Sequence, residues 1–141
     1  MSGGIMKKFD DKLEKLNMAL ESLEDMIEFS NTANIKLEKF DEAIRDSIIK
    51  KFEYTFELTW KTIKAYLEEE GYEEIASPKK TLKQAFEMGL IKDEEIWSNM
   101  LEARNSTANT YDEEKAVYYE DVIKSKYINM IKQLVQKLNE V

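Results

Sequence analysis

The sequence predicts an all-α protein, an antiparallel bundle of about five helices. Helix breakers are scarce: one Pro and four Gly occur in 141 residues, and two of these glycines lie within the first four positions. Leu, Lys, Glu, Ile and Ala are abundant, and apolar residues recur at helical spacing. This length suits one domain with a single core, which we expect over residues 6–141. Residues 1–5 are expected to be a flexible leader or a cloning remnant.

Two long helices are expected in the first half of the chain. The first should cover residues 9–27, where a narrow seam of apolar residues is spaced by three or four positions: Phe9, Leu13, Leu16, Leu20, Leu23 and Ile27. Small polar residues at 30–34 predict a loop. The second helix should cover residues 40–70 and end at Gly71. An arc of roughly 120° marks it as the central helix and holds eight large apolar residues: Ile48, Ile49, Phe52, Phe56, Trp60, Ile63, Tyr66 and Leu67.

The second helix is apolar on a second side as well. Tyr54, Leu58 and Ala65 lie nearly opposite its main apolar face. A helix with two apolar sides is either buried between layers or forms half of an interface. We therefore predict a homodimer through these three residues. Glu57, four residues before Lys61, is interpreted as part of a solvated flank of salt bridges.

Three further helices are expected in the second half of the chain. Ser77-Pro78 is typical of an N-cap followed by a first-turn proline, and Gly89 should end the short helix that begins there. Asp93 is placed to cap a fourth helix that runs into Arg104. A polar break is predicted over residues 104–113. Thr110 and Glu113 have the spacing of a capping box, so a long last helix should begin at them.

The polar break at residues 104–113 is the main candidate functional segment, because it holds a guanidinium, two carboxamides, three hydroxyls and a phenol. Each group also has a purely structural interpretation. Arg104 could close the fourth helix by bonding to its last carbonyls and to an acidic neighbour. Asn109 could be a turn residue, and Tyr111 a half-buried packing residue.

Composition excludes several classes of function. The chain has no Cys and no His, which removes disulfides, thiolate metal sites, the usual zinc ligand and the usual general base. Its net charge of −8 disfavours a dominant nucleic-acid function. No phosphate-binding loop, dinucleotide fingerprint or spaced set of metal ligands occurs. We expect a cytoplasmic protein without cofactor or metal, and no apolar run approaches the ~18 residues that span a bilayer.

Two stretches resemble the signatures of the nucleotidyltransferase substrate-binding family. The first is residues 52–61, Phe-Glu-Tyr-Thr-Phe-Glu-Leu-Thr-Trp-Lys, and the second is Arg104-Asn105 through Thr110-Tyr111-Asp112-Glu113. The resemblance implies membership of the HEPN superfamily of helical bundles, which commonly form homodimers. It also implies a separately encoded minimal nucleotidyltransferase as partner, often in a toxin–antitoxin pair. This chain lacks the Gly-Ser loop and the Asp-x-Asp pair of the transferase itself.

The superfamily resemblance also implies roles for individual residues. In its ribonucleases an Arg, a polar residue and, after three more residues, a His form a site across the dimer. The Arg corresponds to Arg104 and the polar residue to Asn105, but Asn109 stands at the histidine position. A Tyr two residues further on can accept AMP from the transferase, and this corresponds to Tyr111.

Two hypotheses follow from these assignments. The favoured one is a non-catalytic subunit that docks the transferase and is a target of its AMPylation, with at most weak contact to nucleotide or RNA. The alternative is a HEPN-type ribonuclease toxin, weakened or inactive because an asparagine amide cannot exchange a proton near neutral pH.

Overall fold

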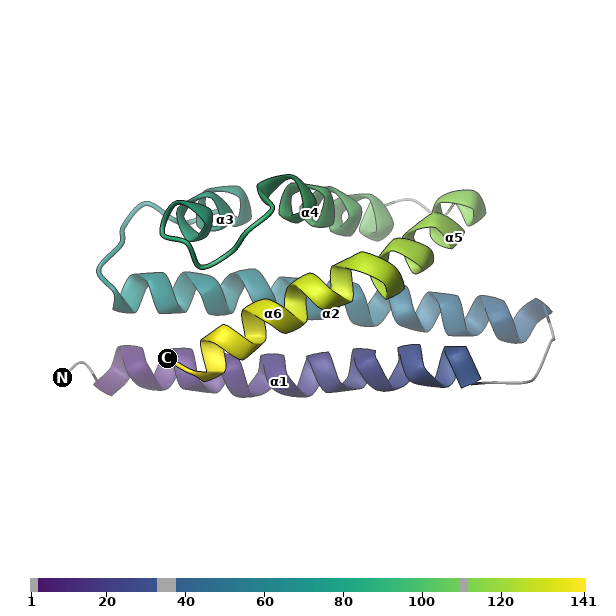
Figure 1. The fold of residues 1–141 in the computed structure, drawn as a ribbon, viewed down its shortest axis with the longest axis horizontal. Helices are drawn as coiled ribbons and strands as arrows, with labels where there is room; N and C mark the ends of the chain where they lie inside the picture. Colours follow the sequence, from purple (N-terminus) through teal and green to yellow (C-terminus); the bar gives the residue numbers. More distant parts are fainter. Residues whose placement is uncertain (1–2, 33–37, 110–111) are drawn as a thin grey trace.

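The computed structural model describes residues 3–32, 38–109 and 112–141, and the described residues form an all-α bundle. Helix α1 (Gly3–Thr32) and helix α2 (Glu38–Glu69) lie side by side as a long antiparallel hairpin (Figure 1). The shorter α3 (Pro78–Glu87) and α4 (Glu94–Asn109) pack along α2 on the side away from α1. The chain then crosses the hairpin obliquely through α5 (Glu113–Val122), η1 (Ile123–Tyr127) and α6 (Ile128–Asn139).

Helix α2 is the centre of the bundle, as the sequence predicts, because it contacts α1, α3, α4 and α5. Its residues Phe52, Phe56 and Ile63 are fully buried. The predicted seam of α1 faces them, with Leu16 and Leu23 fully buried. The wide apolar arc of α2 therefore holds three layers of helices together.

The end of α1 differs from the prediction of a loop at residues 30–34 for residues 30–32, while residues 33 and 34 lie outside the described residues. Ser30 and Thr32 belong to the last turn of the helix instead. The Ser30 hydroxyl donates to the Ile27 carbonyl at 2.6 Å, and the Thr32 hydroxyl donates to the Glu28 carbonyl at 3.1 Å. A serine or threonine hydroxyl can bond to the carbonyl three or four residues earlier without ending the helix, so these small polar residues are accommodated in its last turn.

The predicted end of α2 and both predicted ends of α3 are confirmed. Gly71 follows α2 with a φ of +93°, and Gly89 follows α3 with a φ of +82°, conformations that side chains other than glycine rarely adopt. Ser77 is the N-cap of α3 and accepts a hydrogen bond from the Lys80 amide at 3.2 Å. Pro78 occupies the first helical position, where no amide donor is needed.

The polar break predicted over residues 104–113 is wrong for its first six residues. Helix α4 continues to Asn109, so Arg104 lies inside the helix rather than at its end. The reason is tertiary packing, because Trp97, Met100 and Ala103 of α4 are buried in the core. A helix anchored on one face tolerates a polar last turn.

The cap of the next helix is also a correction. Asp112 is the N-cap of α5, and its carboxylate accepts hydrogen bonds from the amides of Glu114 at 3.0 Å and Lys115 at 3.3 Å. The predicted capping box of Thr110 and Glu113 would start the helix earlier, whereas α5 begins at Glu113. Thr110 itself lies outside the described residues. The short side chain of an aspartate at the N-cap position reaches these amides directly, so no capping box is needed.

The last helical segment contains one wider turn. Residues Ile123–Tyr127 form a π-helical segment between α5 and α6. Tyr127 is buried there, and its ring stacks on Phe52 with centroids 5.7 Å apart. A single π-turn is a usual way to redirect side chains within a helix. None of the helices in the described ranges has the length and hydropathy to cross a membrane.

Raising the pH is expected to destabilise the fold through Tyr127. Burial raises the pKa of Tyr127 to about 12, with smaller contributions from Tyr118, Tyr119 and Glu102. An unfolded chain has a tyrosine pKa near ~10, so this stabilisation is complete below about pH 10 and is lost as the pH rises toward about 12. The loss is roughly 2 to 3 kcal/mol. Urea unfolding at about pH 9 and about pH 11 measures about half of this loss, because pH 11 lies midway between the two pKa values.

The control for this pH effect is Tyr127→Phe, which removes the phenol and keeps the ring. This variant is expected to lose less stability between the two pH values than the natural chain. An identical pH dependence in both proteins would contradict the role of Tyr127.

The second apolar side of α2 is smaller than the sequence predicts. Tyr54 is 58% exposed and Leu58 is partly buried, but Ala65 is only 2% exposed. Ala65 is therefore already covered by this chain and is not available to a partner, because the bundle encloses that part of α2. The predicted interface is reduced to Tyr54 and Leu58.

Candidate functional site

Arg104 is the centre of the candidate site, and α2 supplies its counter-ion. The Nε of Arg104 on α4 lies 3.4 Å from Oε2 of Glu57 on α2. The other oxygen of Glu57 lies 3.3 Å from Nζ of Lys61, one turn further along α2. The two stretches that resemble family signatures therefore meet in one cluster of three charges, Glu57, Lys61 and Arg104.

The positions of these residues follow from the packing of α4 on α2. Ala103 is buried and Arg104 follows it on the edge of the buried face. The side chains of Arg104 and Glu57 are 30% and 32% exposed, so the ion pair is half-buried at the seam between the two helices. A half-buried pair is screened less by water and salt than a fully exposed one.

The carboxylate of Glu57 is charged in this environment. Burial raises its pKa, but the nearby Trp60 indole N–H, the Lys61 ammonium and the Arg104 guanidinium together outweigh burial and lower the pKa below its ordinary value. The Trp60 N–H lies close enough to act on this charge, yet Nε1 is buried without an aligned hydrogen-bond partner among the described residues. Its effect is therefore that of a nearby dipole.

The guanidinium of Arg104 is held by charge rather than by hydrogen-bond geometry. Its Nε is buried and, within the described ranges, makes no aligned hydrogen bond, although Glu57 is within ion-pair distance. The cluster contains two cations and one carboxylate. Such a cluster keeps a net positive charge on an acidic protein, so a phosphate group could bind here in competition with Glu57.

A shallow groove of about 470 Å³ lies next to Arg104 on α4. Its lining is mostly polar: Lys79, Ser98, Leu101, Glu102, Asn105 and Ser106. Asn105 is exposed and belongs to this lining. Arg104 itself does not line the groove.

The other predicted site residues are placed less completely. Asn109 is the last residue of α4, so its backbone is helical and not the turn that the sequence allows. Tyr111 lies outside the described residues. The structure thus brings Arg104 together with Glu57 and Lys61. Sequence reasoning placed Glu57 on a solvated flank, although its position within the first signature stretch was a signal for the site.

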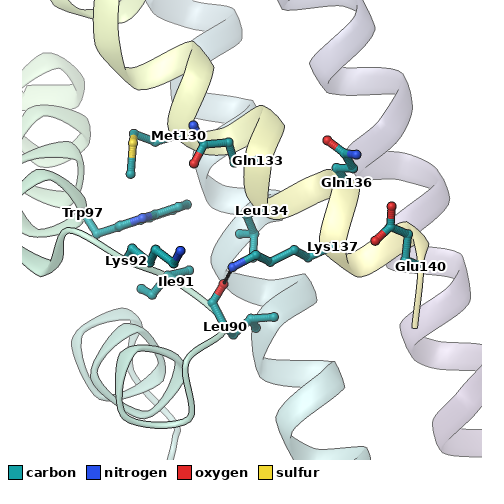
Figure 2. Close-up of a pocket in the computed structure, with 10 residues that line it drawn as sticks. All are labelled: Leu90, Ile91, Lys92, Trp97, Met130, Gln133, Leu134, Gln136, Lys137 and Glu140. Atoms are coloured by element: carbon teal, nitrogen blue, oxygen red, sulfur yellow. Dashed lines mark hydrogen bonds between the residues drawn. The ribbon is translucent and has the colours of Figure 1, made fainter.

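A second pocket lies on the far side of α4 and contains none of the predicted site residues. It has a volume of about 290 Å³ and lies between the α3–α4 turn and α6 (Figure 2). Trp97 and Leu134 form its apolar floor, and Lys137 donates a hydrogen bond to the Leu90 carbonyl at 3.3 Å across it. This bond connects α6 to the turn, so we interpret the pocket as a packing feature. No group of three or more potential metal ligands occurs among the described residues.

This chain, a helical bundle that carries Arg104, matches a known family. Residues 11–140 match the family described as nucleotidyltransferase substrate binding protein like. The chain belongs to this family, as its two signature stretches suggest.

Two solved structures share the fold. One, from Haemophilus influenzae, is described as revealing the fold of a substrate binding domain of a nucleotidyltransferase. It is 28% identical, has a TM-score of 0.82, and the match covers 90% of this chain and 98% of that one. The other, from Thermus thermophilus, is 32% identical with a TM-score of 0.72, and the match covers 87% of this chain and 98% of that one.

One curated relative is named as an enzyme. It is a Haemophilus influenzae protein called probable ribonuclease HepT, 37% identical over 73 residues. The match spans 49% of this chain and 50% of that protein. This similarity supports the HEPN relationship.

Proposed function

We propose that this chain is a non-catalytic binding subunit that docks a separately encoded minimal nucleotidyltransferase. The proposal rests on the environment of Arg104 and on the residue at the histidine position of the motif. Arg104 is paired with Glu57, and the position where a ribonuclease needs a histidine is Asn109, in a chain without any histidine. The site has a phosphate-binding cation but no group that exchanges protons near pH 7.

Tyr111 is the proposed acceptor of an AMP group from the partner. It follows the end of α4 by two residues and directly precedes Asp112, the N-cap of α5. A tyrosine hydroxyl has a pKa near ~10, so the transferase must supply the base or metal that activates it. The acceptor hydroxyl attacks the α-phosphorus of ATP, pyrophosphate leaves, and the hydroxyl proton passes to that base.

Two features that could help to bind AMP at the start of α5, a nearby Arg104 and free backbone amides, are limited by the structure. Arg104 lies five residues before the end of α4 and not at that end. The Asp112 carboxylate already accepts from the amides of Glu114 and Lys115, so those amides are not free for a phosphate. Arg104 is also engaged by Glu57, so a phosphate that binds its Nε would compete with that carboxylate.

Co-expression with the nucleotidyltransferase encoded beside it is expected to yield a stable complex on size exclusion. Incubation with ATP and magnesium should then add one AMP to this chain, measured by intact mass. Tyr111→Phe is expected to abolish the labelling, and Tyr119→Phe serves as the matched control. Labelling at another residue, or no labelling despite a stable complex, would contradict the role of Tyr111.

A homodimer through α2 is the second part of the proposal. Tyr54 and Leu58 are apolar side chains on the open side of α2, and exposed apolar patches often mark interfaces. Leu58→Lys is expected to convert the dimer into a monomer, because it places a charge in the centre of the contact. Light scattering after size exclusion measures the mass.

The matched control for the dimer is Phe86→Lys, which adds the same charge at an exposed apolar residue on α3. A dimer that persists in Leu58→Lys would exclude this patch as the interface. A natural chain that is monomeric would contradict the dimer itself.

A ribonuclease remains the second candidate because the curated relative carries that name. In that case Arg104 would bind the scissile phosphate of RNA after displacing Glu57. The expected rate of RNA cleavage differs by orders of magnitude between the two candidates.

A further inference from the structure

Helix α5 is poorly covered by its own chain. Of its ten residues only Val122 is buried, while Ala116 and Tyr119 are partly buried against the core. Two large apolar side chains face solvent instead, with Val117 48% exposed and Tyr118 58% exposed. Single exposed apolar residues are ordinary, but two neighbours on one weakly packed helix form a small patch.

Carboxylates flank this patch on both sides along the helix. Glu113 and Glu114 precede Val117 and Tyr118 by about one turn, and Asp121 follows by about one turn. All three are exposed. We call these five residues, Glu113, Glu114, Val117, Tyr118 and Asp121, the α5 surface. Its apolar centre and charged rim have the organisation of a protein–protein contact.

Other carboxylates of α5 have separate roles. Asp112 caps the helix, and Glu120 lies 3.9 Å from Nε of Arg45 on α2. Lys115 is the one basic residue of α5, and the next basic residue along the chain is Lys124 of η1. The α5 surface is therefore acidic as far as Asp121, and the chain becomes basic from Lys124 onward.

This charge pattern selects the kind of occupant. A nucleic acid is disfavoured because its phosphates would meet three carboxylates. A second copy of this chain docked through the same surface would place like charges opposite each other, which costs free energy. A basic surface fits, since Lys and Arg side chains can pair with the carboxylates while an Arg guanidinium stacks on the Tyr118 ring.

We infer that the α5 surface is the contact by which this chain holds a basic segment of its nucleotidyltransferase partner. The inference rests on the proposed function and adds the contact surface and the charge of the partner. Tyr118 lies on the first two turns of α5, about 9 Å along the axis from Asp112. A transferase bound there lies close to Asp112, which directly follows the proposed acceptor Tyr111 in the sequence.

Titration of the full chain with the purified transferase, with Kd measured at low and high salt, tests the inference. Tyr118→Lys is expected to weaken binding by about tenfold or more, as for a central aromatic contact residue. Glu114→Lys and Asp121→Lys should each weaken binding less, by roughly threefold to tenfold, and should reduce its salt dependence. Circular dichroism verifies that each variant is folded, and Tyr118→Ser replaces Tyr118→Lys if the latter unfolds.

The matched control is Phe86→Lys on α3, which places the same charge at another exposed aromatic residue, outside both the α5 surface and the proposed dimer contact. Binding that survives Tyr118→Lys but is lost in Phe86→Lys would overturn the inference and place the partner on α3. Salt-independent binding, or a Tyr118→Lys variant that only changes a dimer into a monomer, would also overturn it. If the natural chain forms no complex, the proposed function fails together with the inference, whereas an unaffected complex of Tyr118→Lys overturns the inference alone.

Discussion

The purified chain is expected to leave RNA uncleaved at neutral pH over times in which an active ribonuclease degrades it. General acid–base catalysis contributes typically ~10²–10⁴-fold in rate, and it needs a group that gains and loses a proton near the working pH. The chain has no histidine, and Asn109 stands at the histidine position of the motif. Glu57, the carboxylate at Arg104, has a lowered pKa and is therefore a poor base.

Weak binding of RNA is compatible with this expectation, because Arg104 keeps a cationic guanidinium at the seam of α2 and α4. The converse substitution, Asn109→His, is expected to introduce cleavage that the further substitution Arg104→Ala then removes. Gel analysis of a labelled RNA measures both, with Asn109→Gln as the control for a change of side-chain size. Efficient cleavage by the natural chain that is lost in Arg104→Ala would establish the ribonuclease instead.

Phe56→Ala is expected to lower the free energy of unfolding by about 3–5 kcal/mol, the range for large-to-small changes at buried aromatic residues. Phe56 is fully buried. Its ring lies 6.0 Å from that of Phe52 on the same helix and 6.4 Å from that of Trp97 on α4. The substitution leaves a cavity at the point where α4 packs on α2, so it should also loosen the pairing of Arg104 with Glu57.

Urea unfolding measures this loss as a lower midpoint with an unchanged slope. Tyr118→Ala is the matched control, since it removes an aromatic ring that is 58% exposed on α5, outside the proposed dimer contact. Its effect should stay within about 1 kcal/mol. Equal losses for the two variants would mean that the core is not organised around Phe56.

Local signals in the sequence determined the helices and several of their ends. The apolar spacing of α1 and α2 predicts both helices, because burial of one helical face requires that period. Ser77-Pro78, Gly71 and Gly89 act within a few residues of their own position, and all three have the expected roles. The two signature stretches also suggested the family, and the match over residues 11–140 confirms it.

Tertiary packing decided what local patterns left open. Residues 104–109 read as a polar break, but burial of Trp97, Met100 and Ala103 stabilises α4 as far as Asn109. Ala65 read as part of an exposed patch, but the bundle covers it. A residue's own neighbours in sequence do not reveal which of its faces another helix will cover.

The residues of the candidate site were also only partly predictable from the sequence. Arg104 and Asn105 were identifiable from the motif alone, whereas the partner of Arg104 was not. Glu57 is 47 positions earlier in the chain and was assigned to Lys61, its neighbour one turn away, which it also contacts. Only the packing of α4 against α2 brings the Glu57 carboxylate to 3.4 Å from the guanidinium, because a contact between distant helices depends on how both of them pack in the core.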